Sequence, residues 1–372
     1  MVTILFVIGQ LGLGGGEKQL YLQLKYLDRQ IFNPIVVSFN PGAGDYWEQP
    51  ILDLGIDIYF VEKSFNKFKR LRNFYKIVKK LNPKIIQSCS VAFNFPVSLV
   101  GNLLHIPFII GSVRQNLFRK GENPRTAFDR YISIVGIDYF LSNSTQGQRD
   151  LIKLGIDKSK IHVLFNGIET FADSTFDLHP DDLRESWGAS PDDLVIGTIC
   201  SLHWVKNLDF LLLVFKSLLE KYENLFMVIF GDGPEYENLL KASKDLKIER
   251  KIKLLGRDPN AFWKIKGFDV FCFTSISEGM PNALIEAAIS GLPIVTSDIG
   301  GARDIVVDGK SGFICEDYQV KTYVKYISLL LDHPQMRRDF GLFAEEFAKK
   351  RFDVNKIGSE FNGFYKTILD IL

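Results

Sequence analysis

Short apolar runs recur along the chain, and each is followed by a turn and a longer stretch with helical periodicity. Strand and helix patterns that alternate in this way predict parallel sheets covered by helices. An acidic segment with two prolines, residues 171–193, separates two series of such units. We therefore expect an α/β protein with two doubly wound domains, 1–172 and 173–355. A chain of 372 residues is long enough for both.

The two parts of the chain carry opposite charges. The net charge is +8 for residues 1–172 and −7 for the rest, which leaves +1 overall. A basic segment, Lys63–Lys84, holds nine Lys or Arg residues, and its apolar residues from Phe65 to Leu81 recur at spacings of three and four. This pattern predicts an amphipathic helix whose apolar stripe packs on the sheet. Its charges are either a solvated face or a contact with an anionic membrane surface.

Cysteine and histidine patterns give no sign of a metal or redox centre. The four cysteines and five histidines lack ligand spacing, so we expect reduced cysteines, no metal and no cofactor. The N-terminus lacks the features of a signal peptide, and no apolar run approaches transmembrane length. We expect a cytoplasmic protein that lies on a membrane surface if it meets one.

The most informative stretch is S-E-G-M-P-N-A-L-I-E-A-A-I-S-G-L-P, residues 277–293, between two predicted strands. A glycine- and proline-containing turn leads into a helix predicted over Asn282–Ile289. Turn amides and a helix N-terminus favour an anion. Glu278 and Glu286 flank the helix start and could bind hydroxyl groups. The stretch therefore suits a ligand with both phosphate and hydroxyls, such as a nucleotide sugar.

Three other turns carry glycines or cations after predicted strands. The run G-Q-L-G-L-G-G-G, residues 9–16, is either a phosphate cradle or a flexible turn, and it matches neither the dinucleotide fingerprint nor a P-loop. Lys206 follows the first strand of the second domain, where it can meet a phosphate at a helix N-terminus. Arg114 follows the strand predicted over 107–110, and it is either a ligand-binding or a surface arginine.

The pair Glu278 and Glu286 resembles the E-x7-E motif of the retaining GT-B glycosyltransferases of family 4. Further stretches agree with that family in order: G-G-G-E-K at 14–18, S-N-S at 142–144, F-N-G-I-E at 165–169, K-N at 206–207, G-D-G-P at 231–234, L-G at 255–256 and G-G at 300–301. The resemblance implies the GT-B fold, in which two Rossmann-like domains face each other across a cleft. It also implies that the last helix, 356–372, crosses back onto the first domain.

The resemblance also assigns roles to residues. Glu286 should bind the ribose hydroxyls, Glu278 the donor sugar, and Lys206 the diphosphate. The donor-binding group is completed by Gly279, Met280, Pro281, Asn282, Leu255, Gly256, Arg257 and Ser201. The loop near the diphosphate and the acceptor consists of Gly14, Gly15, Gly16 and Glu17.

Two positions depart from the family pattern. Ser201 stands where the family often has an arginine, and Gly111 opens the stretch where it often has a histidine. We expect Arg114 to supply the missing charge, and we count it with Glu278 and Lys206 as catalytic. Gln87 and Cys89 also replace histidines, which argues against a histidine-based site.

The resemblance implies an enzyme that moves a sugar with retention, and without a metal, from a nucleoside-diphosphate sugar to a glycan acceptor. We expect UDP, which is frequent in the family, and a lipid-linked acceptor in polysaccharide or glycolipid assembly. We expect no nucleic-acid partner. Two other classes stay open: a GT-B nucleotide-sugar epimerase, and a non-catalytic nucleotide-sugar-binding protein, which Ser201 and the absent histidines would suit.

Overall fold

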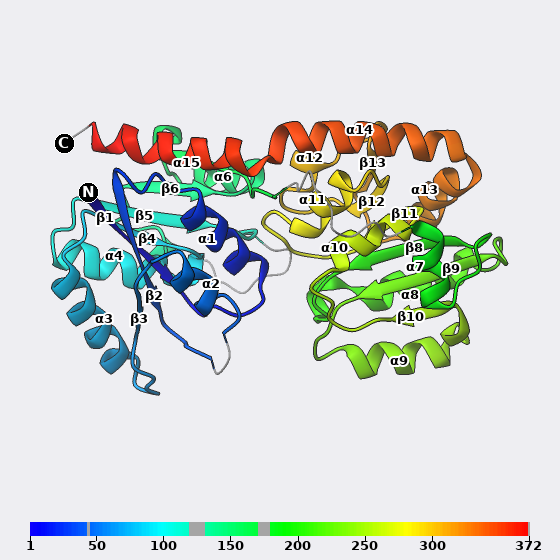
Figure 1. Cartoon of the computed structure of the whole chain (residues 1–372), viewed down its shortest axis with the longest axis horizontal. Coiled ribbons are helices and arrows are strands. Elements are labelled where there is room, and N and C mark those ends of the chain that lie inside the picture. Colours follow the sequence, from blue (N-terminus) through cyan, green and yellow to red (C-terminus); the bar gives the residue numbers. More distant parts are fainter. Residues whose placement is uncertain (43–44, 119–130, 170–178, 371–372) are drawn as a thin grey trace. The chain divides into compact units, whose positions relative to one another are not determined.

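The computed structural model describes residues 1–42, 45–118, 131–169 and 179–370, and it divides into two compact units (Figure 1). The first unit combines Met1–Gly167 with Val354–Leu372, and the second is Ile168–Asp353. The boundary expected at 172/173 falls within 170–178, outside the described residues. The second division, after residue 353, comes two residues before the expected one.

The first unit contains a parallel sheet with the order β3-β2-β1-β4-β5-β6-β7 among the described residues. Its strands are β1 (Val2–Ile8), β2 (Phe32–Ser38), β3 (Ile58–Phe60), β4 (Ile85–Ser88), β5 (Phe108–Val113), β6 (Tyr139–Ser142) and β7 (Ile161–Val163). The direction of the strand order reverses between β1 and β4. In doubly wound sheets, ligands bind at the carboxyl edge where this reversal occurs.

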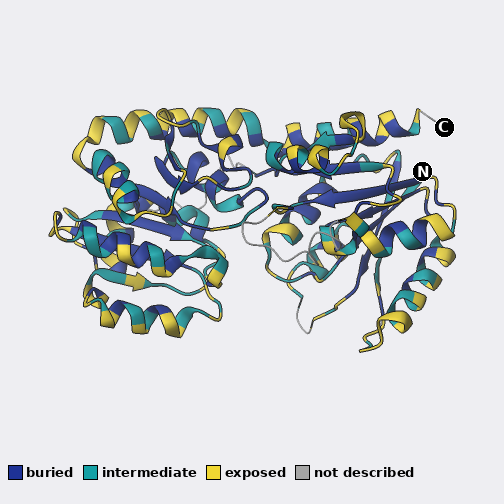
Figure 2. Ribbon diagram, turned by 180° about the vertical axis from the view of Figure 1, so that it is seen from behind, coloured by how far each residue is buried: buried dark blue, intermediate teal, exposed yellow. Residues whose placement is uncertain are grey.

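Alternate side chains of β1 enter two hydrophobic layers, as the two-residue period of a strand requires. Ile4 and Phe6 pack with helices α1 and α15, whereas Leu5 and Val7 pack with α3 and α4. Figure 2 shows the strands as buried ribbons between helices whose outer sides are exposed. The described residues of this unit form the helices α1 (Gly15–Lys25), α2 (Glu48–Asp53), α3 (Lys67–Leu81), η1 (Val91–Phe93), α4 (Asn94–Leu103), α6 (Thr145–Lys153), η2 (Lys158–Lys160) and α15 (Val354–Leu369).

The C-terminal helix α15 belongs to the first unit although it follows the second unit in sequence. Its Tyr365 is fully buried, and its hydroxyl accepts a hydrogen bond from Gln23 Nε2 on α1 (2.6 Å) and donates one to Gln87 Oε1 on β4 (2.6 Å). Within the described residues, the other amide atoms, Gln23 Oε1 and Gln87 Nε2, have no hydrogen-bond partner. Both buried glutamines therefore depend on the Tyr365 hydroxyl.

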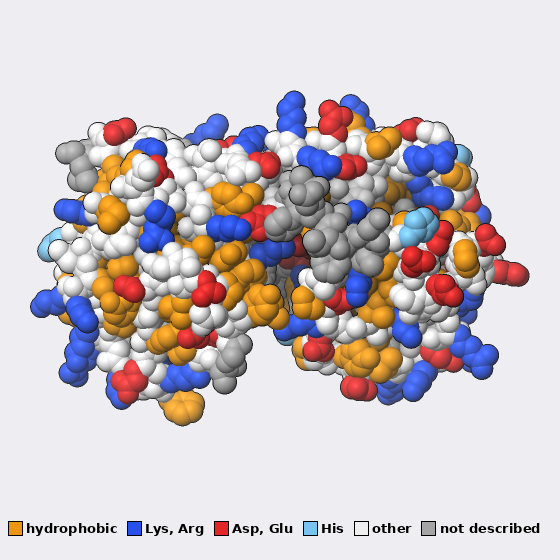
Figure 3. All heavy atoms as spheres, viewed as in Figure 1, with side chains coloured by type: hydrophobic (Ala, Val, Ile, Leu, Met, Phe, Trp, Pro, Cys, Tyr) orange, Lys and Arg blue, Asp and Glu red, His pale blue; other side chains and the backbone are white. Residues whose placement is uncertain are grey.

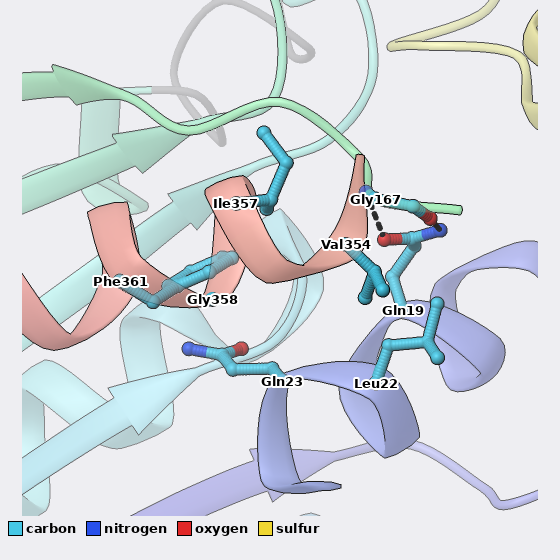
Figure 4. A pocket seen from close by; sticks show the side chains of 8 residues that line it. All are labelled: Gln19, Leu22, Gln23, Gly167, Val354, Ile357, Gly358 and Phe361. Carbon is cyan, nitrogen blue, oxygen red and sulfur yellow. Dashed lines mark hydrogen bonds between the residues drawn. The ribbon is translucent and has the colours of Figure 1, made fainter. Parts of the chain in front are cut away.

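A small pocket lies between α1 and α15 (Figure 4). At one end, the Gln19 side chain donates to the Gly167 carbonyl (2.8 Å) and accepts from the Gly167 amide (2.9 Å). On α15, the Asn362 amide nitrogen donates to the carbonyl of Tyr26 (2.9 Å). These polar bonds hold the C-terminal helix and the end of the first chain segment against α1.

The second unit contains a parallel sheet with the order β10-β9-β8-β11-β12-β13, and the direction of the order reverses between β8 and β11. Its strands are β8 (Leu194–Ile199), β9 (Leu225–Phe230), β10 (Ile252–Leu254), β11 (Val270–Phe273), β12 (Ile294–Ser297) and β13 (Gly312–Cys315). The two parallel sheets confirm the predicted α/β class.

The helices of the second unit surround a core formed mainly by β8, β9, α8 and α13. They are α7 (Pro180–Trp187), η3 (Trp204–Lys206), α8 (Leu208–Leu218), α9 (Tyr236–Asp245), η4 (Glu249–Lys251), α10 (Ala261–Lys264), η5 (Ile265–Gly267), α11 (Asn282–Ile289), α12 (Ala302–Ile305), α13 (Val320–Asp332) and α14 (Pro334–Phe352). Across the part of the chain that the structure describes, no helix has both the length and the apolar character that crossing a bilayer requires.

The basic helix is shorter than its periodicity predicts. It spans Lys67–Leu81 rather than Lys63–Lys84. The Asn66 side chain caps its N-terminus by accepting from two first-turn amides, at 2.9 and 3.2 Å. At the other end, Asn82 adopts the left-handed conformation (φ 42°) immediately before Pro83, which ends the helix.

The predicted apolar stripe of this helix is wrong at its N-terminal end. Phe74 and Val78 are fully buried on the sheet, as expected. In contrast, Phe65 lies before the helix, and both Phe65 and Phe68 are exposed. Helical spacing predicts which side a residue faces, but it does not show whether the sheet extends beneath that turn.

Replacing Tyr365 with Phe should destabilise the first unit, because it keeps the ring but leaves two buried amides without their partner. Such a loss typically costs about 1–3 kcal/mol. We expect a decrease of this size in the unfolding free energy measured with urea. The control Tyr131→Phe removes a hydroxyl from a side chain that is 60% exposed and should change stability by less than about 0.5 kcal/mol. Equal stability of Tyr365→Phe and wild type would contradict the account.

Candidate active site

An ion pair joins two turns at the carboxyl edge of the second sheet. β8 and β11 are adjacent parallel strands, so the turns that follow them lie side by side. Lys206 in the first turn donates a hydrogen bond to the carboxylate of Glu278 in the second. Both side chains are largely buried, with 17% and 16% exposed. The lysine nitrogen also lies 5.5 Å from the centre of the Phe273 ring.

Ser275 organises the turn that carries Glu278. Its hydroxyl lies within hydrogen-bond distance of the Glu278 carboxylate (2.8 Å) and of the Val205 carbonyl (3.0 Å). Its own carbonyl accepts from Ser297 Oγ (2.6 Å) and from the Tyr318 hydroxyl (2.8 Å). The turn is thus tied to the β8 turn, to β12 and to the segment after β13. None of these partners was predicted. The bonds to Val205, Ser297 and Tyr318 join residues far apart in sequence, whereas the bond to Glu278 lies within one turn.

The diglycine at 300–301 lets a second loop pack against this turn. Gly300 has φ +43°, and a β-carbon at this position would lie 2.2 Å from the carbonyl oxygen of Glu278. The Gly301 amide donates to the carbonyl of Gly279 at 2.5 Å. A larger residue at position 300 would therefore displace the backbone that carries Glu278.

Helix α11 begins directly after the turn. Pro281 occupies its N-cap position and makes no side-chain capping hydrogen bond, and the first turn contains no acidic residue. Gly279, Met280 and Pro281 are buried, while Asn282 and Glu286, about one turn apart, are half-buried. A helix start of this kind is electrostatically suited to an anion.

The remaining residues predicted to bind the sugar donor lie in turns of the same edge, and Ser201 shares the turn that holds Lys206. Ser201 follows β8 and is exposed. Leu255, Gly256 and Arg257 follow β10, which is three strands from β11, or about 14 Å. Gly256 has φ +70°, and its carbonyl accepts from the Gly231 amide (2.7 Å). The structure therefore brings Lys206 and Glu278 into contact and places the 255–257 group further along the edge.

In the first unit, the glycine-rich loop, Cys89 and Arg114 follow the neighbouring strands β1, β4 and β5. β5 runs to Val113, three residues past its predicted end, so Arg114 directly follows the strand. Burial lowers the pKa of the half-buried Arg114, while Cys89, Tyr365 and Glu17 oppose that shift. Arg114 remains a cation at neutral pH. Burial raises the pKa of the Cys89 thiol to about 12, so it remains protonated.

The Glu17 side chain lies at the N-terminus of α1. Burial raises its pKa and Asp45 adds to the increase, whereas its own amide and the charge of Arg114 lower the pKa. The side chain folds back over Gly14, where a β-carbon would lie 2.0 Å from a carboxylate oxygen. Gly15 and Gly16 are exposed. A phosphate at this helix start would have to displace the carboxylate.

A buried polar cluster fixes the ends of β4 and β5. The Ser112 amide lies 2.9 Å from Ser88 Oγ and 3.0 Å from Asn94 Oδ1, and the Ser112 hydroxyl donates to the Ser88 carbonyl at 2.6 Å. All three residues are fully buried. Since Cys89 and Arg114 follow within two residues, the cluster sets where they leave the sheet. The sequence signal for this cluster was the presence of polar residues at the ends of two apolar strands, and the sequence analysis did not use it.

Solved structures with this arrangement are GT-B glycosyltransferases, and the chain has the GT-B fold. The Anabaena protein HepE, solved in complex with UDP-glucose, superposes with a TM-score of 0.84. The match covers 99% of this chain and 100% of that chain at 18% identity. This likeness shows the fold.

Sequence comparisons add the family. A model described as Glycosyltransferase Family 4 matches residues 13–170, and one described as Glycosyl transferases group 1 matches 180–347. Together the two models match most of the chain. The chain therefore belongs to glycosyltransferase family 4 and is a glycosyltransferase, which confirms the resemblance found in the sequence motifs.

Two curated relatives illustrate the match. An uncharacterized glycosyltransferase from Haemophilus influenzae is 26% identical over 377 aligned positions, which cover 98% of this chain and 99% of the relative. The Campylobacter jejuni N-acetylgalactosamine-N,N'-diacetylbacillosaminyl-diphospho-undecaprenol 4-alpha-N-acetylgalactosaminyltransferase is 28% identical over 225 residues. That second match covers 60% of this chain and 58% of the relative.

A double-mutant cycle measures the ion pair of this site. Lys206→Met leaves the largely buried Glu278 carboxylate with fewer partners. Glu278→Gln leaves the largely buried Lys206 ammonium without its carboxylate partner. We expect each change to lower the unfolding free energy by about 2–4 kcal/mol. The double variant should lose less unfolding free energy than the two single variants lose together, by at least about 1 kcal/mol.

The control for this cycle is Lys221→Met, which breaks the exposed Lys221–Asp332 pair. Because those side chains are 55% and 40% exposed, the change should cost less than about 1 kcal/mol. Strict additivity of the Lys206 and Glu278 changes would show that the two groups do not interact in solution.

Proposed function

We propose that this enzyme transfers a sugar, with retention of anomeric configuration, from a UDP-sugar to a hydroxyl of a lipid-linked glycan. The observation that carries the proposal is the Lys206–Glu278 ion pair beside the start of α11, with Glu286 on the same helix. Lys206 provides a cation that can bind a diphosphate, and the two glutamates provide carboxylates that can bind hydroxyl groups. HepE was solved with UDP-glucose, and the Campylobacter relative is named for a diphospho-undecaprenol acceptor, which supports the two substrate classes.

Donor binding follows from the charges of the second unit. A diphosphate at the start of α11 would accept hydrogen bonds from first-turn amides and from Lys206. The ammonium has three donors, so it can contact a phosphate oxygen while it still contacts Glu278. Glu286 would accept from the ribose hydroxyls, and the backbone at Leu255–Arg257 would meet the base.

The chemistry requires stabilisation of a leaving phosphate. The bond between the anomeric carbon and the diphosphate oxygen breaks as the acceptor hydroxyl attacks from the same face, and the departing oxygen takes the acceptor's proton. We propose that Lys206 and Arg114, without a metal ion, neutralise the charge that develops on the phosphate. Glu278 serves as a sugar clamp. Its pairing with Lys206 and Ser275 supports this role over that of a nucleophile.

The proposed acceptor sets the place of the reaction. A glycan on a lipid carrier stays at a membrane face, and a UDP-sugar is a soluble substrate. We therefore propose that the enzyme works peripherally at the cytoplasmic face of a membrane, in polysaccharide or glycolipid assembly.

The test of the proposal compares UDP-sugars with and without a polyprenyl-diphosphate-linked sugar. We expect UDP to raise the melting temperature and a new glycan product to appear only when the acceptor is present. Conversion of the donor sugar without acceptor would instead identify an epimerase. Stabilisation by UDP with no product under any condition would identify a binding protein.

Replacing Glu286 with Ala should weaken UDP binding. Two hydrogen bonds from ribose hydroxyls to a carboxylate are lost, so we expect the dissociation constant to rise at least about tenfold in calorimetric titration. Glu249→Ala removes an exposed carboxylate from the same unit and should leave the affinity unchanged. Unaltered UDP affinity in Glu286→Ala would remove the ribose assignment.

Replacing Arg114 with Ala should slow transfer. Loss of one donor to the developing negative charge typically lowers kcat about 100- to 1,000-fold. Arg114→Lys keeps the charge and should recover part of the rate, while Arg149→Ala changes an exposed arginine of the same unit and should be neutral. Normal turnover of Arg114→Ala would exclude Arg114 from the site.

A further inference from the structure

Two phenylalanines at the start of α3 are exposed on the surface of the first unit. Phe65 is 109% exposed and Phe68 is 83% exposed, on a scale relative to the free residue. In Figure 3, an apolar side chain projects at the end of this unit where α3 begins, and Lys and Arg side chains line α3. Neighbouring exposed aromatic side chains of this kind are typical of an interaction surface.

The exposed phenylalanine of the helix lies in line with three cations. Phe68, Arg72, Lys76 and Lys79 are spaced at i, i+4, i+8 and i+11, which places them along one face of α3. All four are exposed, and α3 contains no acidic residue. Within the described residues, no hydrogen bond or ion pair engages the three cationic side chains. We call Phe65 and these four residues the α3 stripe.

Two further cations of α3 contact other residues of the first unit and are not counted in the stripe. Arg70 donates to the Phe39 carbonyl (2.9 Å) and to the Asn40 side chain (2.6 Å). Lys69 pairs with Glu62 at 3.4 Å. Some charges of the helix are therefore engaged with neighbouring residues, and the stripe combines exposed aromatic and cationic groups.

The α3 stripe starts at the carboxyl edge of the first sheet, where Arg114 and the glycine-rich loop also lie. β3 ends at Phe60 and leads into α3, so Phe65 and the first turn of α3 lie on the carboxyl-end side of the sheet. Arg114 and the glycine-rich loop follow strands at that same edge. β3 is two positions from β1 in the sheet, a distance of about 10 Å.

We propose that the α3 stripe is a membrane-docking surface for an anionic bilayer. Phe65 and Phe68 insert at the boundary between headgroups and acyl chains, and Arg72, Lys76 and Lys79 lie over lipid phosphates. Charge complementarity favours this occupant. Two phenylalanines would bury roughly 200 Å² each. Their combined area is well below the roughly 800 Å² that each partner buries in a stable protein–protein interface, so a membrane suits the stripe better than a protein partner does. The inference rests on the proposed lipid-linked acceptor, which such docking would bring to the sheet edge that carries Arg114.

The experiment is co-sedimentation of the full chain with vesicles, without substrates. We expect binding to phosphatidylcholine vesicles that contain about 30% phosphatidylglycerol, little binding to phosphatidylcholine alone, and release at about 1 M salt. Phe65→Ser/Phe68→Ser should lower the partition coefficient at least about tenfold. Arg72→Gln/Lys76→Gln/Lys79→Gln should lower it about fivefold for each charge removed.

Two control variants change similar groups elsewhere on the first unit. Leu103→Ser alters a leucine that is 60% exposed, and Lys158→Gln/Lys160→Gln removes two exposed charges. Both should bind vesicles like wild type. Equal binding of the stripe variants and wild type, or no binding to anionic vesicles, would overturn the proposal.

UDP affinity measured on the same preparations separates this inference from the proposed function. We expect every stripe and control variant to bind UDP like wild type. If UDP binds but anionic vesicles do not, the docking surface is wrong and the transferase proposal stands. If UDP does not bind to wild type, the proposed function is wrong whatever the vesicles show.

Discussion

The Lys206–Glu278 ion pair connects two turns at the carboxyl edge of the second unit's sheet, and the proposed donor site depends on it. It joins the turns after β8 and β11, the two strands between which the strand order reverses. The Ser275 hydroxyl contacts the Glu278 carboxylate, and the diglycine at 300–301 packs against the Glu278 backbone. Both contacts keep Glu278 beside the start of α11. A largely buried lysine is stable there because of its carboxylate partner. The pair thus keeps a cation at the position where we propose that the diphosphate binds.

The N-termini of α1 and α11 are satisfied in different ways. The carboxylate of Glu17 folds over its own helix start and lies in the field of Arg114. The N-cap residue of α11 is Pro281, which makes no side-chain capping hydrogen bond, and the first turn of α11 contains no acidic residue. Because a helix N-terminus attracts negative charge, the second of these is the better position for a ligand anion. This difference supports donor binding in the second unit.

Local sequence patterns predicted the fold well because they depend on neighbouring residues. The helix expected over Asn282–Ile289 matches α11 to the residue, and the family inferred from spaced motifs is confirmed. The contact between Lys206 and Glu278 was not predicted, since it follows from the adjacency of β8 and β11. The exposure of Phe68 was missed because periodicity does not show where the sheet ends. The roles of the site residues stay predictions.

The central claim is that a donor diphosphate binds between the Lys206 turn and the start of α11. Hydrogen–deuterium exchange of the full chain with and without saturating UDP tests it most directly. The account predicts slower exchange in 201–207 and 277–286, with a smaller effect at 255–257. Protection confined to the first unit, or no protection in the two turns while UDP is bound, would contradict it.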